Sequence, residues 1–213
     1  MNATKLIKNF ISSEEQAEMI FFINSLFNLD PNLENEHIRT VRDYLKGESY
    51  IWDISGTNVS SYLANFQSSG NLLDPNQLPQ IFKDYIKKIS DKLEIDDSHT
   101  FLQIVTMNPG GKISPHYDTG YPGYINYKCN ISLKSEDYKL FIDDHYINIS
   151  ESDLYAFEAS LYKHWTEPFQ ESRILLSIGF ALPYQSLGRS EEDPRVRMSN
   201  RIIKYFQKYD NNN

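Results

Sequence analysis

The spacing of apolar residues predicts two helices in the N-terminal half of the chain. In SSEEQAEMIFFINSLFN, residues 12–28, apolar side chains follow a rough helical stripe, and Ser13 with Gln16 forms a candidate capping box. A clearer stripe runs through residues 77–93, where apolar side chains recur at intervals of three and four and give one broad apolar face. Residues 30–76 are rich in Asn, Ser, Gly and Asp, and only isolated pieces such as SYIWDI resemble strands.

From residue 100 onwards the pattern changes to short strands separated by turn sequences. In NYKCNISL, residues 126–133, apolar and polar side chains alternate, so this strand has one apolar and one polar face. The other runs are rich in β-branched and aromatic residues: TFLQIVTM, YKLFI, HYINI, DLYAF and RILLSIGFAL. Strands this short and evenly spaced predict a sandwich or barrel, and DPRVRMSNRIIKYFQKY, residues 193–209, predicts a last helix.

Composition and charge narrow the functional classes. The 213 residues are 40% hydrophobic, which is enough for one domain with a substantial core. A net charge of -8 and a pI of about 5.1 make nucleic acid an unlikely partner. Cys129 is the single cysteine, which excludes an internal disulfide and a cysteine-based zinc site. Without a signal-peptide pattern or an apolar run of the ~18 residues that a membrane helix needs, we expect a soluble, cytoplasmic protein.

Three residues in the predicted β region have the pattern of metal ligands. His116 and Asp118 are two positions apart, and residues i and i+2 of an extended segment point to the same side. His164, just before the last long strand, is the best candidate for a third ligand. Two histidines and one carboxylate on one side of a metal form the facial triad of non-haem Fe(II) oxygenases. We therefore predict that His116, Asp118 and His164 are catalytic metal ligands.

Arg173 is a candidate anchor for a carboxylate. It lies nine residues after His164, at the start of RILLSIGF, and a guanidinium can hold a carboxylate through two parallel hydrogen bonds. Ser177, four residues further on, shares the same face of the strand. Together these side chains would grip one end of a dicarboxylate co-substrate.

At these residues the sequence resembles the Fe(II)- and 2-oxoglutarate-dependent oxygenases. LQIVTMNPGGKISPHYD is similar to the segment before the metal ligands in the prolyl-hydroxylase branch, and FEASLYKHWTE resembles the aspartyl/asparaginyl β-hydroxylase branch. The resemblance covers about residues 100–182 and implies a double-stranded β-helix, or jelly roll, that is mainly β with flanking helices. Within a single domain, residues 1–99 would give helical support and a substrate-covering segment, and residues 183–213 a helical extension.

The resemblance also implies a reaction. The cofactors would be Fe(II), 2-oxoglutarate and O2, with ascorbate as an accessory reductant, and 2-oxoglutarate and O2 would become succinate and CO2. The substrate to be hydroxylated would be an amino acid, an amino-acyl residue or a small metabolite. The sequence does not determine the oligomeric state.

One contact to 2-oxoglutarate differs from the family pattern. Many relatives carry a tyrosine just before the Pro-Gly turn, where this chain has Met107 and Asn108. Another residue is therefore expected to supply that contact. The candidates are Tyr127 and Asn130, then Ser132 and Gln103.

Two other functions are compatible with the same residues. A non-catalytic jelly-roll module would keep a metal or a dicarboxylate as a structural element. A cupin-type metalloenzyme would not use 2-oxoglutarate, and Arg173 would then be an ordinary ion-pair partner. The sequence Asp143-Asp144-His145 is interpreted as a hairpin turn rather than a metal cluster.

Overall fold

A computed structural model describes residues 4–29, 59–65, 80–97, 100–107, 109–113, 115–118 and 122–210. Its elements are β1 (Thr4–Ile7), α1 (Ser13–Leu29), β2 (Val59–Asn65), α3 (Gln80–Leu93), β3 (Thr100–Met107), β4 (Tyr124–Lys134), β5 (Tyr138–Ile142), β6 (His145–Ile149), β7 (Leu154–Glu158), β8 (His164–Thr166), β9 (Arg173–Pro183), the 3-10 helix η2 (Tyr184–Leu187) and α4 (Pro194–Asp210). None of the helices in these ranges is long and apolar enough to cross a membrane.

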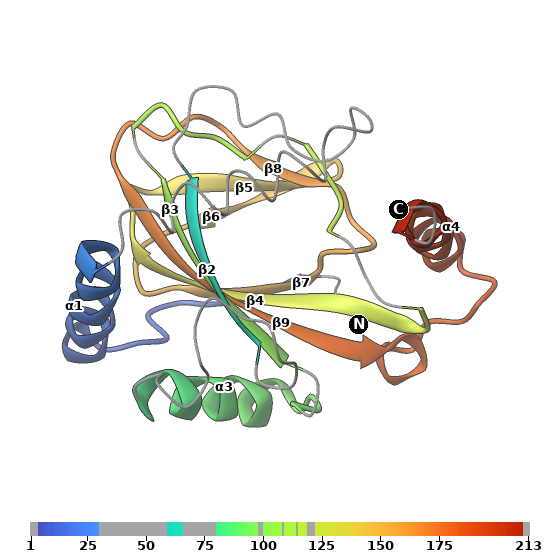
Figure 1. The fold of residues 1–213 in the computed structure, drawn as a ribbon, viewed down its shortest axis with the longest axis horizontal. Coiled ribbons are helices and arrows are strands. Elements are labelled where there is room, and N and C mark those ends of the chain that lie inside the picture. Colours follow the sequence, from blue (N-terminus) through green and yellow to red (C-terminus); the bar gives the residue numbers. More distant parts are fainter. Residues whose placement is uncertain are drawn as a thin grey trace.

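The described strands form two sheets. The larger sheet has six strands in the order β1-β7-β4-β9-β3-β2, and the smaller has three in the order β6-β5-β8. Every strand pairing among the described elements is antiparallel. Figure 1 shows the smaller sheet facing the larger one, with the helices outside. The mainly β architecture with flanking helices therefore agrees with the prediction from the sequence.

The alternation of side chains along β4 separates two environments. Cys129 and Ile131 belong to a core that also contains residues of α1 and α3, so they point to the outer face of the large sheet. Asn130 and Ser132 point the other way, yet they are buried as well, with exposed fractions of 5% and 0%. The polar face predicted for this strand thus lies inside the protein, between the sheets, where buried polar groups need partners.

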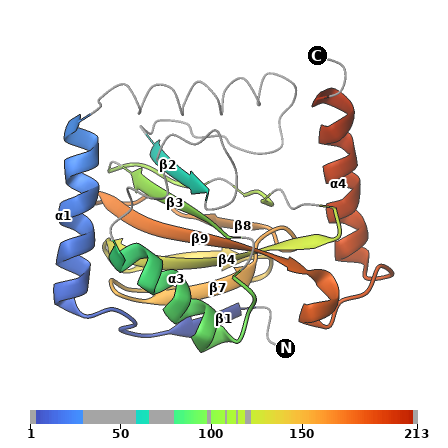
Figure 2. The same cartoon turned by 60° about the horizontal axis from the view of Figure 1, so that its bottom comes forward.

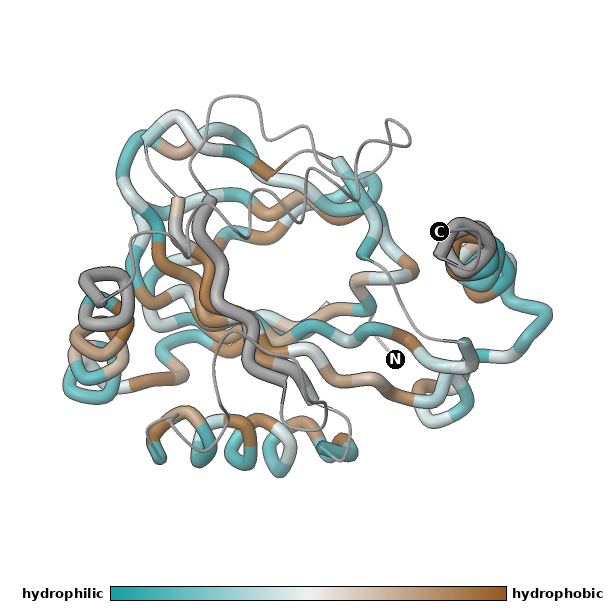
Figure 3. Tube along the Cα trace, viewed as in Figure 1, coloured by the Kyte–Doolittle hydropathy of each residue, from teal (hydrophilic) through white to brown (hydrophobic). Residues whose placement is uncertain are grey.

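The helices cover the outer face of the large sheet. Helix α3 buries an apolar stripe that includes Phe82, Ile86 and Ile89, and its polar side faces away from the sheet (Figure 3). Figure 2 shows α1 and α3 on one side and α4 at the opposite end of the sheet. The helices thus add an apolar core outside the large sheet, separate from the apolar cluster between the sheets.

The capping box of α1 lies one residue earlier than predicted. The Glu15 amide donates to Ser12 Oγ at 3.2 Å, and the Ser12 amide donates to Glu15 Oε2 at 2.8 Å. The prediction of Ser13 and Gln16 is therefore wrong, because Ser13 is already the first helical residue. Gln16 instead donates from Nε2 to the Leu133 carbonyl at 2.7 Å and ties the helix to the end of β4.

Three strands were not predicted. β1 and β2 form the two edges of the large sheet, and β8 has only three residues. β1 pairs with β7, so the N-terminal region contributes strands as well as helical support. The strand-like piece SYIWDI lies outside the described residues.

Candidate metal centre and carboxylate anchor

Backbone pairing brings the three predicted metal ligands together. The His116 amide donates to the His164 carbonyl at 3.2 Å, and the His164 amide donates back at 2.9 Å, which joins segments 48 positions apart. The Asp118 amide donates to the Ala159 carbonyl at 3.0 Å. One ligand atom from each side chain then lies within 4.8 Å of the others.

The environment of His164 keeps its imidazole neutral. The ring is buried, and Nδ1 lies 3.0 Å from the Tyr162 carbonyl, which can only accept, so Nδ1 carries the proton. Nε2 then carries a lone pair, and it lies 3.7 Å from Asp118 Oδ1. Burial, with the neighbouring His116 ring, lowers the pKa of His164 to about 3. A neutral imidazole with a fixed tautomer is the form that binds a metal.

Asp118 completes the set as a buried carboxylate. Its Oδ1 lies 3.1 Å from His116 Nε2, and its Oδ2 lies 2.9 Å from Lys128 Nζ. Burial alone would raise the pKa of Asp118, but Lys128 and the two imidazoles hold it well below the usual range. Two imidazoles and one ionised carboxylate suit Fe(II), and protein ligands on one side leave the other coordination positions open.

Arg173 is a buried cation held by tyrosines. Only 1% of it is exposed, and its Nη2 donates to the hydroxyls of Tyr138 and Tyr155 at 2.5 and 3.0 Å. Its guanidinium also lies 4.4 Å from the Tyr138 ring centre and 4.8 Å from that of Phe169. None of the ion pairs found among the described residues includes Arg173. An ionised group without a counter-charge is expensive to bury.

Several hydrogen-bond donors around Arg173 are unused. Its Nε and Nη1 and the Ser177 hydroxyl are buried without a partner in the described structure. The side-chain carbonyl oxygen of Asn130 is buried without a partner there too, but it is an acceptor and needs a donor. The two tyrosine hydroxyls share one hydrogen bond of 3.2 Å, so one O–H remains to be donated. Such groups cost free energy unless they find acceptors. A carboxylate has no donor and up to four lone pairs, so its chemistry fits this cluster.

The anchor and the metal ligands face the same interior. Asn130 on β4 pairs in register with Tyr155 on β7 and Ser177 on β9, which places the three side chains in one row. Further along β7, the Phe157 ring lies 6.3 Å from that of Tyr155 and 4.8 Å from that of His164. The inward face of β7 therefore links the two ends of the site.

The other candidates for the second contact are distributed differently. Tyr127 lies on the opposite face of β4, in the core beneath the helices, so the structure does not bring it to Arg173. The Ser132 hydroxyl is engaged with that of Ser135 at 2.8 Å. Met107 is buried in the apolar cluster between the sheets. Asn108 and the side chain of Gln103 lie outside the described part of the chain.

Three residues of the site were missed from the sequence. Tyr155 shares the inward face of β7 with Phe157. The two-residue alternation of a strand indicates this shared face, but only once β7 is known to be buried on both sides. Tyr138 reaches Arg173 from the opposite sheet, which the sequence cannot show without the pairing of the sheets. Lys128 reads as one polar position among several, and only its contact with Asp118 distinguishes it.

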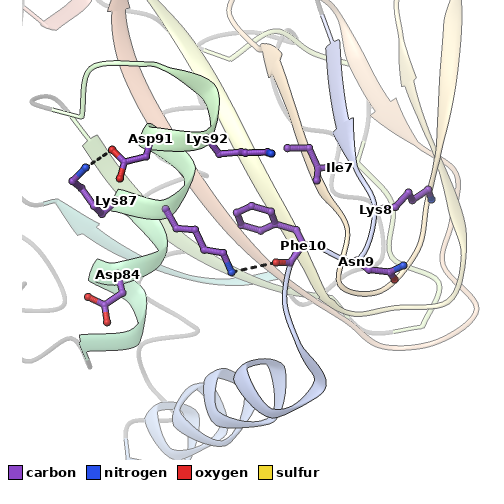
Figure 4. A pocket seen from close by; sticks show the side chains of 9 residues that line it. Ile7, Lys8, Asn9, Phe10, Asp84, Lys87, Asp91 and Lys92 are labelled. Carbon is purple, nitrogen blue, oxygen red and sulfur yellow. Dashed lines mark hydrogen bonds and ion pairs between the residues drawn. The ribbon is translucent and has the colours of Figure 1, made fainter.

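A surface groove lies elsewhere, between α3 and the segment after β1. It has a volume of about 810 Å³ and is lined mostly by charged side chains, of which Lys87 and Asp91 pair with each other (Figure 4). Lys87 pairs with Asp91, Lys88 donates to the Phe10 carbonyl at 3.4 Å, and Lys8 pairs with Asp153 at 2.7 Å. Because none of the candidate ligands lines it, this groove is separate from the metal centre.

Solved prolyl hydroxylases share the fold of this chain. A prolyl-4-hydroxylase from Pseudomonas putida aligns with a TM-score of 0.55 and 12% identity, over 84% of this chain and 92% of that one. The viral collagen prolyl hydroxylase of Paramecium bursaria Chlorella virus-1, solved with 2-oxoglutarate, gives 0.51 and 14%, over 85% and 97%. A Trichoplax adhaerens prolyl hydroxylase, solved with a hypoxia inducible factor peptide, gives 0.57 and 11%, over 89% of each chain.

These comparisons establish the fold. Identities of 11–14% are too low to carry more than the architecture. The predicted double-stranded β-helix is confirmed, and with it the resemblance to Fe(II)/2-oxoglutarate oxygenases at the level of the fold. No protein-family model matches the sequence, and no curated protein matches it either.

Proposed function

We propose that this chain is an Fe(II)- and 2-oxoglutarate-dependent dioxygenase that hydroxylates an amino acid, an amino-acyl residue or a small metabolite. The observation that carries the proposal is the buried Arg173 with its unused donors, in the same interior as the His116, Asp118 and His164 set. A metal site alone would suit many functions. A metal site together with a carboxylate anchor suits a co-substrate that needs both.

Each part of the site has a separate task in this proposal. His116, Asp118 and His164 would hold Fe(II). Arg173, with Ser177 and the tyrosine hydroxyls, would bind the far carboxylate of 2-oxoglutarate. When bound, the iron and 2-oxoglutarate supply the activation of O2, with succinate and CO2 as co-products.

The chain itself orients these groups and keeps water out. The Tyr162 carbonyl fixes the tautomer of His164, and the cation–π contacts from Tyr138 and Phe169 hold the Arg173 guanidinium in place. Apolar side chains fill the interior between the sheets around these residues: Met107, Leu140, Ile142, Phe157 and Leu175. Dry surroundings strengthen every charge–charge contact in the site and limit side reactions.

The similar structures favour one of these substrate classes. The similar structures are prolyl hydroxylases, one of them solved with a peptide of hypoxia inducible factor, which favours an amino-acyl substrate for this chain as well. The net charge of -8 disfavours nucleic acid.

Turnover of 2-oxoglutarate tests the proposed function. With Fe(II), ascorbate and O2, the wild-type chain is expected to form succinate even without its substrate, at a slow uncoupled rate. His116→Ala removes one metal ligand and is expected to lower that rate at least about 100-fold. Equal succinate formation by both proteins would contradict the proposal.

A binding module gives a different result in the same experiment. It would hold Ni(II) or Zn(II) as well as Fe(II), and no O2 would be consumed. A cupin-type enzyme that does not use 2-oxoglutarate would be indifferent to the loss of the Arg173 guanidinium.

A further inference from the structure

Lys128 makes an unusual contact at the candidate metal centre. It lies on the inward face of β4, between Phe157 on β7 and Gly179 on β9, and its side chain is 13% exposed. Its Nζ lies 2.9 Å from Asp118 Oδ2. The other carboxylate oxygen, Oδ1, faces the Nε2 atoms of His116 and His164 at 3.1 and 3.7 Å. The two oxygens of Asp118 therefore have different partners.

This arrangement limits how Asp118 can bind a metal. Oδ1 lies on the side of the two imidazoles, so it is the oxygen available for a shared ion. Oδ2 forms an ion pair with the ammonium of Lys128 but has no hydrogen-bond partner among the described residues. Asp118 would therefore bind through one oxygen and leave an additional coordination position for other ligands.

Lys128 also changes the charge of the centre. Metal binding uses neutral imidazoles and an ionised carboxylate, so the three ligands together carry one negative charge. The ammonium of Lys128 cancels that charge. With a divalent ion bound, the ion, its three ligands and Lys128 together would carry a net charge of +2, whereas without Lys128 the net charge would be +1. Because the surroundings are buried and apolar, these charges are weakly screened.

We infer that Lys128 sets the charge of the metal centre in favour of a dianionic co-substrate and at the expense of metal affinity. The inference rests on the proposed function, because it concerns the same metal site. Lys128 repels the metal ion and attracts the anion that binds to it. Lys128 lowers the metal affinity through repulsion and raises it by orienting the Asp118 carboxylate. At an effective dielectric constant of about 20, we expect the repulsion between its ammonium and a dication to be the larger of the two effects.

Binding measurements on the full chain separate these two effects without turnover. We expect Lys128→Met to bind Ni(II) about tenfold or more tightly than the wild type, because the like charge is gone. The Ni(II)-loaded variant is expected to bind 2-oxoglutarate about tenfold or more weakly. Isothermal titration calorimetry measures both affinities. In the Co(II)-loaded variant, the released carboxylate oxygen should also change the visible d–d spectrum.

Two further variants serve as controls. Lys134→Met removes the same charge from the exposed end of the same strand and is expected to leave both affinities within about threefold of the wild type. Lys128→Arg keeps the charge, so both affinities are again expected to stay within about threefold of the wild type. If Lys128→Met does not fold, Lys128→Gln, which keeps a polar end group, takes its place.

Other outcomes would overturn the inference. Ni(II) binding that is 10- to 100-fold weaker in Lys128→Met, as is typical when a ligand loses an outer hydrogen-bond partner, would make Lys128 only a support for Asp118. Unchanged affinities would make it irrelevant to the site. Equal Ni(II) binding by the wild type and His116→Ala would overturn the proposed function as well, which distinguishes that failure from a failure at Lys128 alone.

Discussion

At the scale of single residues, Arg173 combines a buried charge with hydrogen bonds that are only partly used. Two of its five N–H groups bond to the tyrosine hydroxyls, and those on Nε and Nη1 have no partner among the described residues. The planar fork of a guanidinium matches a carboxylate, whereas an ammonium is a point charge. The shape of the head group should therefore matter as much as its charge.

The variant Arg173→Lys tests this geometry. It keeps the charge but loses the fork and the contacts with Tyr138, so 2-oxoglutarate should bind the Ni(II)-loaded protein at least about tenfold more weakly. Ser177→Ala removes one hydroxyl and should weaken binding by about three- to tenfold. Arg201→Lys, on the exposed side of α4, is the matched control and should have no effect. Unchanged affinity in Arg173→Lys would assign this arginine a structural role only.

The residues of the site differed in how far the sequence could predict them. The sequence alone indicated five residues, because their spacing along the chain fits metal ligands or a carboxylate anchor: His116, Asp118, His164, Arg173 and Ser177. Asn130 and Tyr127 were equal candidates, and only the alternation along β4 separates them, since even-numbered residues point inward. Tyr138 reaches Arg173 from the other sheet, a contact that depends on the pairing of the sheets.

At the scale of elements, the strands from residue 100 onwards were predicted except β8, and β1 and β2 were not predicted. β4 and β9 have eleven residues each and are rich in apolar side chains, whereas β8 has three residues. β8 is a strand because it pairs with β5 and because His164 bridges to His116, both of which are long-range contacts. Local propensity carries little information about such a short strand.

Helix α4 has a contact with the metal-ligand segment that its sequence did not suggest. Arg195 pairs with Asp143 Oδ2 at 2.7 Å, donates to the Leu161 carbonyl at 3.1 Å and lies 4.2 Å from the Tyr162 ring centre. The Tyr162 carbonyl in turn accepts the Nδ1 proton of His164. The first turn of the helix therefore supports the turn that orients a metal ligand.

The variant Arg195→Met tests this support. It breaks the contacts with Asp143 and Leu161, and we expect the free energy of unfolding to fall by about 1 kcal/mol and Ni(II) affinity by about three- to tenfold. Arg197→Met lies two positions further on the same helix and is exposed, so it should change neither. Urea unfolding and calorimetry measure the two quantities. Equal effects of the two substitutions would mean that α4 does not influence the metal ligand.

At the scale of the whole molecule, stability and chemistry occupy opposite faces of the large sheet. The outer face packs against α1 and α3 in one apolar core, whereas the inner face holds the buried polar side chains of the site. Unsatisfied polar groups inside destabilise the fold, and the helix-covered core offsets that cost. This division explains why β4, in which apolar and polar residues alternate, is buried on both faces.

The contact between Glu15 on α1 and Tyr85 on α3 should make the free energy of unfolding depend on pH in the acid range. Hydrogen bonds from Tyr85 and from Ser12 lower the pKa of Glu15 from 4.5 to about 2. A pKa that is depressed in the folded state stabilises the protein above pH 4.5, and this contribution is lost as the pH falls from about 4.5 to about 2. Glu15→Gln should therefore lose less stability over this range in urea unfolding, whereas the exposed Glu18→Gln should follow the wild type. Parallel curves for all three proteins would show that Glu15 does not link the helices, and the cap of α1 would then act locally.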